Sequence, residues 1–183
     1  MKVYKFWHSA DGYKNIDIND SALLQAVVEG FYNDGQRYNK DFGSFHWIEQ
    51  DETPICDFPM INGCIPVVSE RALTIIQPFI EEDGVEILPI NVEEEPFYIL
   101  HPLKIYDVLN TKKSEIQYFK SGRVKNVGKY VFLPAVTNAP FLFQISTLQT
   151  FVFAKEELVQ TISKSQLTGA NFEECPISRC LFF

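Results

Sequence analysis

The side chains best suited to nucleophilic or metal chemistry in this chain are scattered rather than grouped. No two cysteines have Cys-x-x-Cys spacing, and no histidine follows a cysteine at a distance typical of zinc sites. A thiol–imidazole pair built from Cys56 or Cys64 with His101 is one arrangement that would support a cysteine-dependent hydrolase. Because this pairing depends entirely on the fold, the pattern favours a binding protein and leaves the enzyme as an alternative. The residues concerned are Cys56, Cys64, Cys175, Cys180, His8, His46 and His101.

Two acidic runs are the clearest charged features. Glu81 and Glu82 precede Asp83-Gly84, and Glu93, Glu94 and Glu95 precede Pro96. Carboxylates that act as an acid–base pair need an apolar pocket to separate their pKa values, and these runs lie beside turn-forming residues instead. We therefore predict no catalytic, metal-binding or cofactor-binding residues. The five glutamates, Glu81, Glu82, Glu93, Glu94 and Glu95, are predicted as contacts for a basic partner, and the alternative is that they only form solvated surface.

The charge balance narrows the choice of partners. With 16 lysines and arginines against 24 acidic residues, the formal net charge is −8. Nucleic-acid binding requires cations concentrated on one face, and the only basic run, residues 112–123, is typical of a strand at a rim. The sequence predicts no nucleic-acid partner, whereas an acidic surface can steer a basic protein; solubility alone explains the charge equally well.

The elements that must position these residues are two strand–helix–strand units. Residues 67–90 begin with apolar β-branched residues, continue through the helix cap Ser69 and an apolar helical stripe, and restart as a strand after Gly84. Residues 151–174 repeat this order, with Gly169 placed 85 residues after Gly84. At the same offset Leu158 matches Leu73. Each helix needs a sheet to cover its apolar stripe.

The fold class that follows is α+β, with mainly antiparallel sheets and about three helices. A first strand is expected at residues 1–7 and a further helix from Ser21 to about Tyr32, where apolar residues recur at helical spacing. Residues 1–183 are expected to form a single domain, or two lobes that meet near residues 110–122. The sequence has no run of about 18 apolar residues, so no membrane span is predicted. No signal peptide is evident either, and a cytoplasmic protein is therefore expected.

Several segments together resemble the bacterial immunity protein family 11 of polymorphic toxin systems. They are VVSERALTII, GVEILPI, YILHPLKIYDVLN and FVFAKEELVQTISKSQLTGANFE, within residues 57–174. Residues 1–56 lie outside the resemblance. Two positions depart from the family pattern: Asn110 stands where aspartate is usual, and Phe143-Gln144 replaces a Phe-Arg pair.

The resemblance implies an immunity protein that binds a cognate secreted toxin, which the charge suggests is basic, and protects the producing cell. The family has no catalytic residues and no cofactor that could be assigned to positions in this sequence. Two alternatives stay open beside it: the cysteine-dependent hydrolase, and an adaptor that oligomerises through its apolar C-terminal residues 181–183 or through a sheet edge. The oligomeric state and the identity of the toxin are left undetermined.

Overall fold

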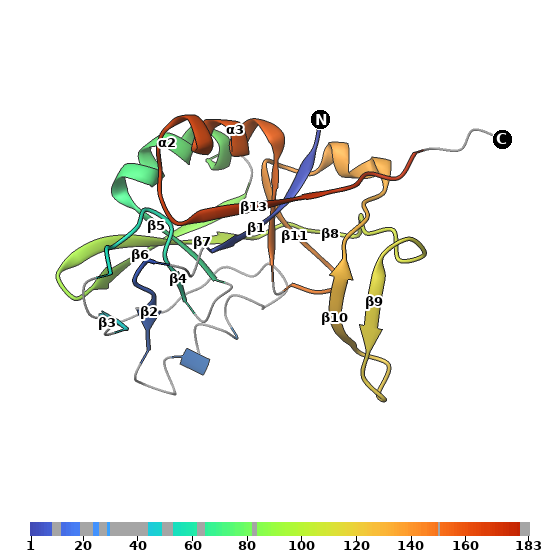
Figure 1. The fold of residues 1–183 in the computed structure, drawn as a ribbon, viewed down its shortest axis with the longest axis horizontal. Helices are drawn as coiled ribbons and strands as arrows, with labels where there is room; N and C mark the ends of the chain where they lie inside the picture. Colours follow the sequence, from blue (N-terminus) through green and yellow to red (C-terminus); the bar gives the residue numbers. More distant parts are fainter. Residues whose placement is uncertain are drawn as a thin grey trace.

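The protein is described by a computed structural model that covers residues 1–8, 12–18, 24–25, 29, 44–48, 53–61, 65–81, 84–149 and 151–179. In these residues the fold is α+β, with mainly antiparallel sheets, as the sequence predicts (Figure 1). Three sheets are formed: a five-stranded sheet in the order β13-β1-β12-β11-β8, a closed barrel in the order β2-β3-β6-β7-β5-β4, and a two-stranded sheet of β9 and β10.

The strands and helices have the following bounds. The strands are β1 (Val3–His8), β2 (Ile16–Asp17), β3 (Ser44–Trp47), β4 (Met60–Ile61), β5 (Ile65–Ser69), β6 (Val85–Val92), β7 (Glu95–Pro102), β8 (Ile105–Tyr106), β9 (Glu115–Tyr118), β10 (Val124–Lys129), β11 (Leu142–Ile145), β12 (Val152–Lys155) and β13 (Ala170–Cys175). The helices are α2 (Glu70–Ile80), α3 (Glu156–Lys164) and the short 3-10 helix η1 (Pro134–Asn138). The expected helix from Ser21 to Tyr32 falls almost entirely outside the described residues.

The first strand–helix–strand unit consists of β5, α2 and β6. The Ser69 hydroxyl accepts a hydrogen bond from the Ala72 amide at 3.1 Å, which confirms the predicted N-cap. Gly84 ends the connection with φ of +74°, a conformation that glycine adopts without steric cost. Strand β7 lies between β5 and β6 and is antiparallel to both, so the two strands of the unit are parallel to each other.

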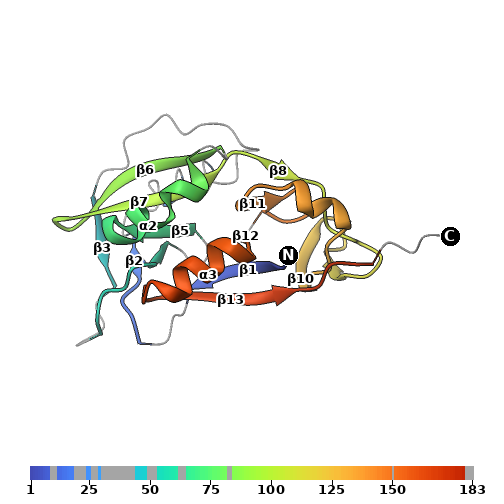
Figure 2. The ribbon, with the colours of Figure 1, turned by 90° about the horizontal axis from the view of Figure 1, so that it is seen from above.

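The second unit, β12, α3 and β13, has the same arrangement. Its two strands are also parallel and also separated by one antiparallel strand, here β1 from the N-terminus. Gly169 has φ of +87°, close to that of Gly84. The helices begin 86 residues apart, at Glu70 and Glu156, so the constant offset of 85 is right for the glycines and one residue short for the helices. Helices α2 and α3 pack against each other on one side of the molecule (Figure 2).

Two hydrophobic cores lie on opposite faces of the five-stranded sheet. Alternate residues of a strand point to opposite faces, and β12 shows this directly. Val152 and Ala154 belong to the core beneath the helices, whereas Phe153 belongs to the second core with Phe132 and Phe143. The sheet is therefore buried on both sides, which explains the near-continuous apolar character of its central strands.

Candidate interaction surfaces

The acidic tip, which we define as Glu93, Glu94 and Glu95, lies at the turn of the β6–β7 hairpin. Val92 pairs with Glu95, so Glu93 and Glu94 form a two-residue turn. Glu93 has φ of +57°, whereas Glu94 is not in the left-handed region, and a positive φ at the first position of a two-residue turn favours glycine. A side chain at this φ costs about 1–2 kcal/mol. The tip therefore carries backbone strain as well as charge.

The tip is held firmly although its side chains are exposed. The Glu93 amide donates to the Phe45 carbonyl at 2.7 Å, which ties the turn to β3. Strand β3 also pairs with β6 beside the turn, with Phe45 opposite Val92. All three carboxylates are exposed. The sequence-predicted contacts at residues 93–95 are thus gathered on one projecting, anchored turn.

Glu81 is not part of this cluster. It caps the C-terminal end of α2 and precedes β6, whereas the acidic tip follows the far end of the same strand. Seven residue steps at about 3.3 Å each place these ends roughly 23 Å apart. Glu82, the remaining predicted contact, lies outside the described residues.

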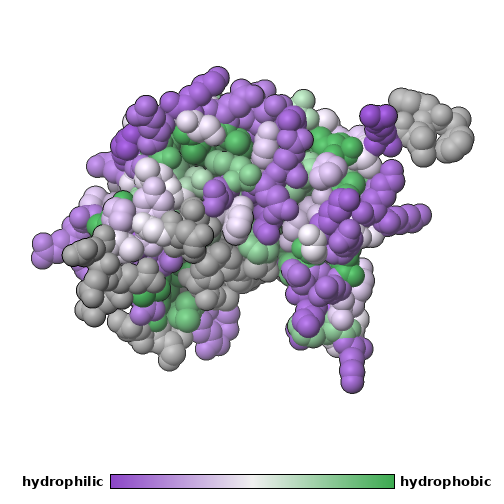
Figure 3. All heavy atoms as spheres, viewed as in Figure 1, coloured by the Kyte–Doolittle hydropathy of each residue, from purple (hydrophilic) through white to green (hydrophobic). Residues whose placement is uncertain are grey.

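A second exposed surface is formed by residues 111–129, which we call the arm. Within the described residues, strands β9 and β10 pair only with each other, and they stand away from the two larger sheets (Figures 1 and 3). Their turn is closed by the Phe119 amide donating to the Arg123 carbonyl at 2.8 Å, with Gly122 at φ of +83°. Val127 is buried in the second core and Ile116 packs against it, so the base of the arm is anchored.

The far end of the arm combines aromatic and cationic side chains. Tyr118 is 56% exposed and Phe119 is 48% exposed, and the Arg123 guanidinium lies 5.9 Å from the centre of the Phe119 ring. From the sequence this segment is expected as a strand at a rim. The degree of aromatic exposure is the feature that only the fold reveals, because Tyr118 and Phe119 could equally have packed inward.

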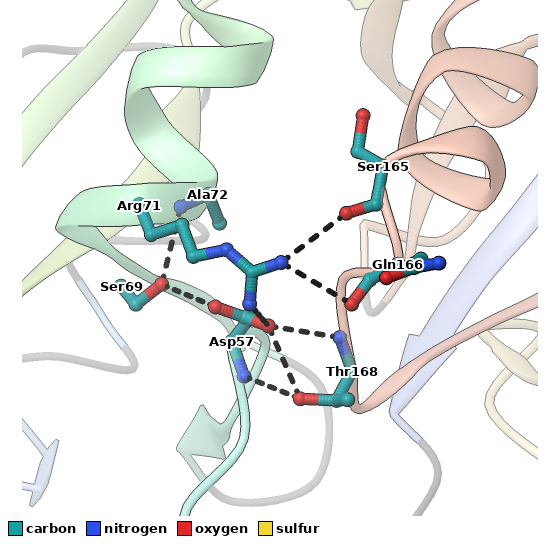
Figure 4. A network of polar contacts seen from close by, with 7 residues as sticks. All are labelled: Asp57, Ser69, Arg71, Ala72, Ser165, Gln166 and Thr168. Atoms are coloured by element: carbon teal, nitrogen blue, oxygen red, sulfur yellow. Dashed lines mark hydrogen bonds and ion pairs between the residues drawn. The ribbon is translucent and has the colours of Figure 1, made fainter.

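A polar network joins the start of α2 to the end of α3 (Figure 4). Asp57, only 8% exposed, accepts hydrogen bonds from the Ser69 hydroxyl at 2.9 Å and from the Thr168 amide and hydroxyl at 3.0 and 3.1 Å. Arg71 lies 3.4 Å from the same carboxylate and donates to the Ser165 carbonyl at 3.3 Å. Each group is satisfied by a partner within the protein, so we assign the network to holding the two units together.

The cysteines in the described residues are poorly suited to nucleophilic attack. Burial raises the pKa of the Cys56 thiol to about 11 and that of Cys175 to about 11, so both are protonated at neutral pH. A thiol must be ionised to act as a nucleophile. Cys64 lies outside the described residues. His101 is buried, with its Nδ1 atom 3.1 Å from a Glu86 carboxylate oxygen.

Within the described part of the chain, no three histidine, cysteine, aspartate or glutamate side chains are grouped closely enough to hold a metal ion. None of the helices in that part has the length and apolarity needed to cross a membrane. No protein-family model matches the chain, and no curated protein matches it either. The immunity function therefore enters as a proposal.

Proposed function

We propose that this protein is a cytoplasmic immunity protein that binds and neutralises a secreted toxin made by the same bacterium. The acidic tip is the observation that carries the proposal: three neighbouring exposed carboxylates on a projecting turn, fixed to β3 by a backbone hydrogen bond. The resemblance of residues 57–174 to immunity proteins supplies the biological setting. Inhibition by binding requires a rigid complementary surface rather than catalytic groups.

The physical role of the acidic tip is to attract and orient a basic surface. Like-charged carboxylates repel each other, and Glu93 adds the cost of its backbone conformation, so the turn is less stable than a glycine-containing turn. A cationic partner relieves the repulsion on binding. Complementary charge also raises the association rate by a factor of about 10 to 10³.

A toxin that cleaves nucleic acid is the kind of basic protein that fits this surface. Such an enzyme must carry cations to bind phosphate groups. An acidic protein at that surface competes electrostatically with the substrate. The basic surface of such a toxin follows from its need to bind phosphate groups, and the net charge of −8 on this protein reinforces the attraction.

The experiment is a binding measurement between this protein and a catalytically inactivated form of the toxin domain encoded by the neighbouring gene. We expect tight binding whose association rate falls as salt rises. Glu93→Gln, Glu94→Gln and Glu95→Gln combined should slow association about ten-fold. The control variant removes the same charge from exposed sites elsewhere, through Glu70→Gln, Asp107→Asn and Glu157→Gln.

The two variants decide whether the acidic tip acts locally. If both variants lose the same association rate, only the total charge matters and the acidic tip is not a specific toxin contact. If the wild-type protein neither binds the toxin domain nor protects cells that express the active toxin, the immunity function is wrong.

A further inference from the structure

Charge is divided very unevenly between the arm and the rest of the molecule. The arm contains six lysines and arginines and one carboxylate, a net charge of +5, which leaves −13 for the remainder of a chain whose total is −8. Among the residues that the structure describes, none of these six cations forms an ion pair. All six are exposed. They are Lys112, Lys113, Lys120, Arg123, Lys125 and Lys129.

The aromatic residues of the arm indicate a docking role beyond simple solvation. Lysines on open strand edges commonly prevent the strand from pairing with another chain, and this role is sufficient to explain the cations of the arm. It does not account for Tyr118, the most exposed large hydrophobic side chain in the described residues, or for Phe119 beside it. Tyrosine, phenylalanine and arginine are the residues enriched at the centres of protein contacts.

A surface that matches the arm is present in the same chain. The acidic tip offers three exposed carboxylates, none of which forms an ion pair within the described residues, and the neighbouring Pro96 is also exposed. The proline ring supplies an apolar face for an aromatic side chain. We infer that the arm of one copy binds the acidic tip of a second copy.

The placement of the two surfaces requires this contact to form between molecules. The arm and the acidic tip project from opposite ends of the protein (Figures 1 and 2). Two copies lying antiparallel satisfy both contacts at once as a two-fold dimer, which is the commonest symmetry of homo-oligomers. The same contact repeated head to tail produces a longer chain of copies.

The strength of the contact depends on ionic strength in a defined direction. Each copy carries −8 overall, which opposes association, but charges farther apart than about 8 Å are largely screened at physiological salt. The arm and the acidic tip meet within that distance, so their attraction dominates. Raising the salt further weakens it. Since the acidic tip is also the proposed toxin contact, dimerisation and toxin binding exclude each other.

Sedimentation velocity of the purified full chain tests this inference without any toxin. Over roughly 10 μM to 1 mM protein, the range in which weak contacts dissociate, we expect a concentration-dependent shift from monomer to dimer. Raising the salt from about 0.1 M to about 1 M shortens the screening length from about 10 Å to about 3 Å and should weaken association at least ten-fold. A wild-type protein that stays monomeric throughout overturns the inference.

A charge exchange identifies the surfaces. An arm variant, Lys120→Glu with Arg123→Glu, and a tip variant, Glu93→Lys with Glu94→Lys, should each be at least ten-fold weaker in self-association. Mixing the two variants should restore a mixed dimer, because the acidic arm of one meets the basic tip of the other. Restoration also shows that both variants are folded.

Two further variants complete the test. Phe119→Ser should weaken self-association without changing charge. The control variant, Lys164→Glu with Arg179→Glu, changes the net charge as much as the arm variant does and should leave self-association at its wild-type strength. The arm–tip contact is rejected if the mixed arm and tip variants fail to associate. It is also rejected if the Lys164→Glu, Arg179→Glu control loses as much self-association as the arm variant. None of these results depends on whether the toxin proposal is right.

Discussion

Replacing Gly169 with alanine is expected to destabilise the protein more than the same change at any other described glycine. An added Cβ atom would lie 2.5 Å from the Cys56 Sγ atom, 2.8 Å from its Cβ atom and 3.2 Å from the Phe58 carbonyl oxygen. The two distances to Cys56 are too short for non-bonded atoms and the third is unusually tight, and the Cys56 Cβ atom and the Phe58 carbonyl are not free to swing away. The loop that carries Cys56 must therefore move.

Two costs add at this position. The backbone has φ of +87°, which costs alanine about 1–2 kcal/mol. Forcing a methyl group into a filled space costs a further 1–3 kcal/mol, roughly. The expected loss is therefore about 2–5 kcal/mol, a large part of the stability of an ordinary domain.

Gly122 provides the matched control. Its φ is +83°, nearly the same as that of Gly169, but no atom of the described residues lies within 4 Å of an added Cβ atom. Gly122→Ala should cost only the backbone term, about 1–2 kcal/mol. Gly84→Ala should fall between the two, because its nearest neighbour at 3.1 Å is the flexible end of Lys104.

Urea denaturation of the three variants measures these differences. With a slope of about 2 kcal/mol per molar urea, a loss of 2–5 kcal/mol lowers the midpoint by roughly 1–2.5 M. Combining Gly169→Ala with Cys56→Ala removes the nearest clash, so the double variant should lose less than the sum of its parts. If Gly169→Ala and Gly122→Ala cost the same, the close approach to Cys56 has no energetic importance and the reasoning is refuted.

Three other changes test separate parts of the structure. Glu93→Gly should stabilise the protein by about 0.5–1 kcal/mol in urea denaturation, because glycine adopts the positive φ freely; a loss of stability would show that the turn is not strained. Asp57→Ala should destabilise by about 3 kcal/mol, because it leaves several donors without an acceptor, whereas Asp107→Ala at an exposed site should change stability by less than about 0.5 kcal/mol. Stability should fall between pH 9 and pH 11: the unfolded chain releases the protons of Cys56 and Cys175 near pH 9.0, whereas the native state holds them to about pH 11. Denaturation midpoints at pH 8 and pH 10 check this, and the drop should shrink when both cysteines are replaced by alanine; an unchanged drop assigns it to other groups.

The parts of the fold that sequence reasoning predicted correctly depend on neighbouring residues. The Ser69 cap, the apolar stripe of α2 and the glycine stop are local features, since a cap reaches only three residues ahead and a left-handed residue is marked by glycine itself. The same holds for the second unit at Gly169. The sequence also indicates that residues 93–95 lie beside a turn, because Pro96 follows them directly, and the β6–β7 hairpin turns at this point.

The parts that were not predicted depend on contacts between distant residues. Asp57 and Thr168 are 111 positions apart, and no local pattern marks either as a partner of the other. The insertion of β7 and β1 as middle strands follows from pairing rather than from strand propensity. The sequence places Glu81 and residues 93–95 beside turns and predicts one partner for both, but strand β6 separates them in the fold. To predict the exposure of Tyr118, one must know which residues of the arm reach the second core, and the sequence alone does not show this.

The position of β1 affects how the protein is made. Its two neighbours, β12 and β13, begin with Val152 and end with Cys175, so β1 pairs with strands that are synthesised long after it. At about 5–20 residues per second, β1 waits roughly 7–30 seconds for β12 to be synthesised. The unit of β5, α2, β6 and β7 has no such delay, because its strands follow one another directly. The nascent chain can therefore complete the first unit before β12 and β13 exist, whereas the second unit can form only after Cys175 has been synthesised.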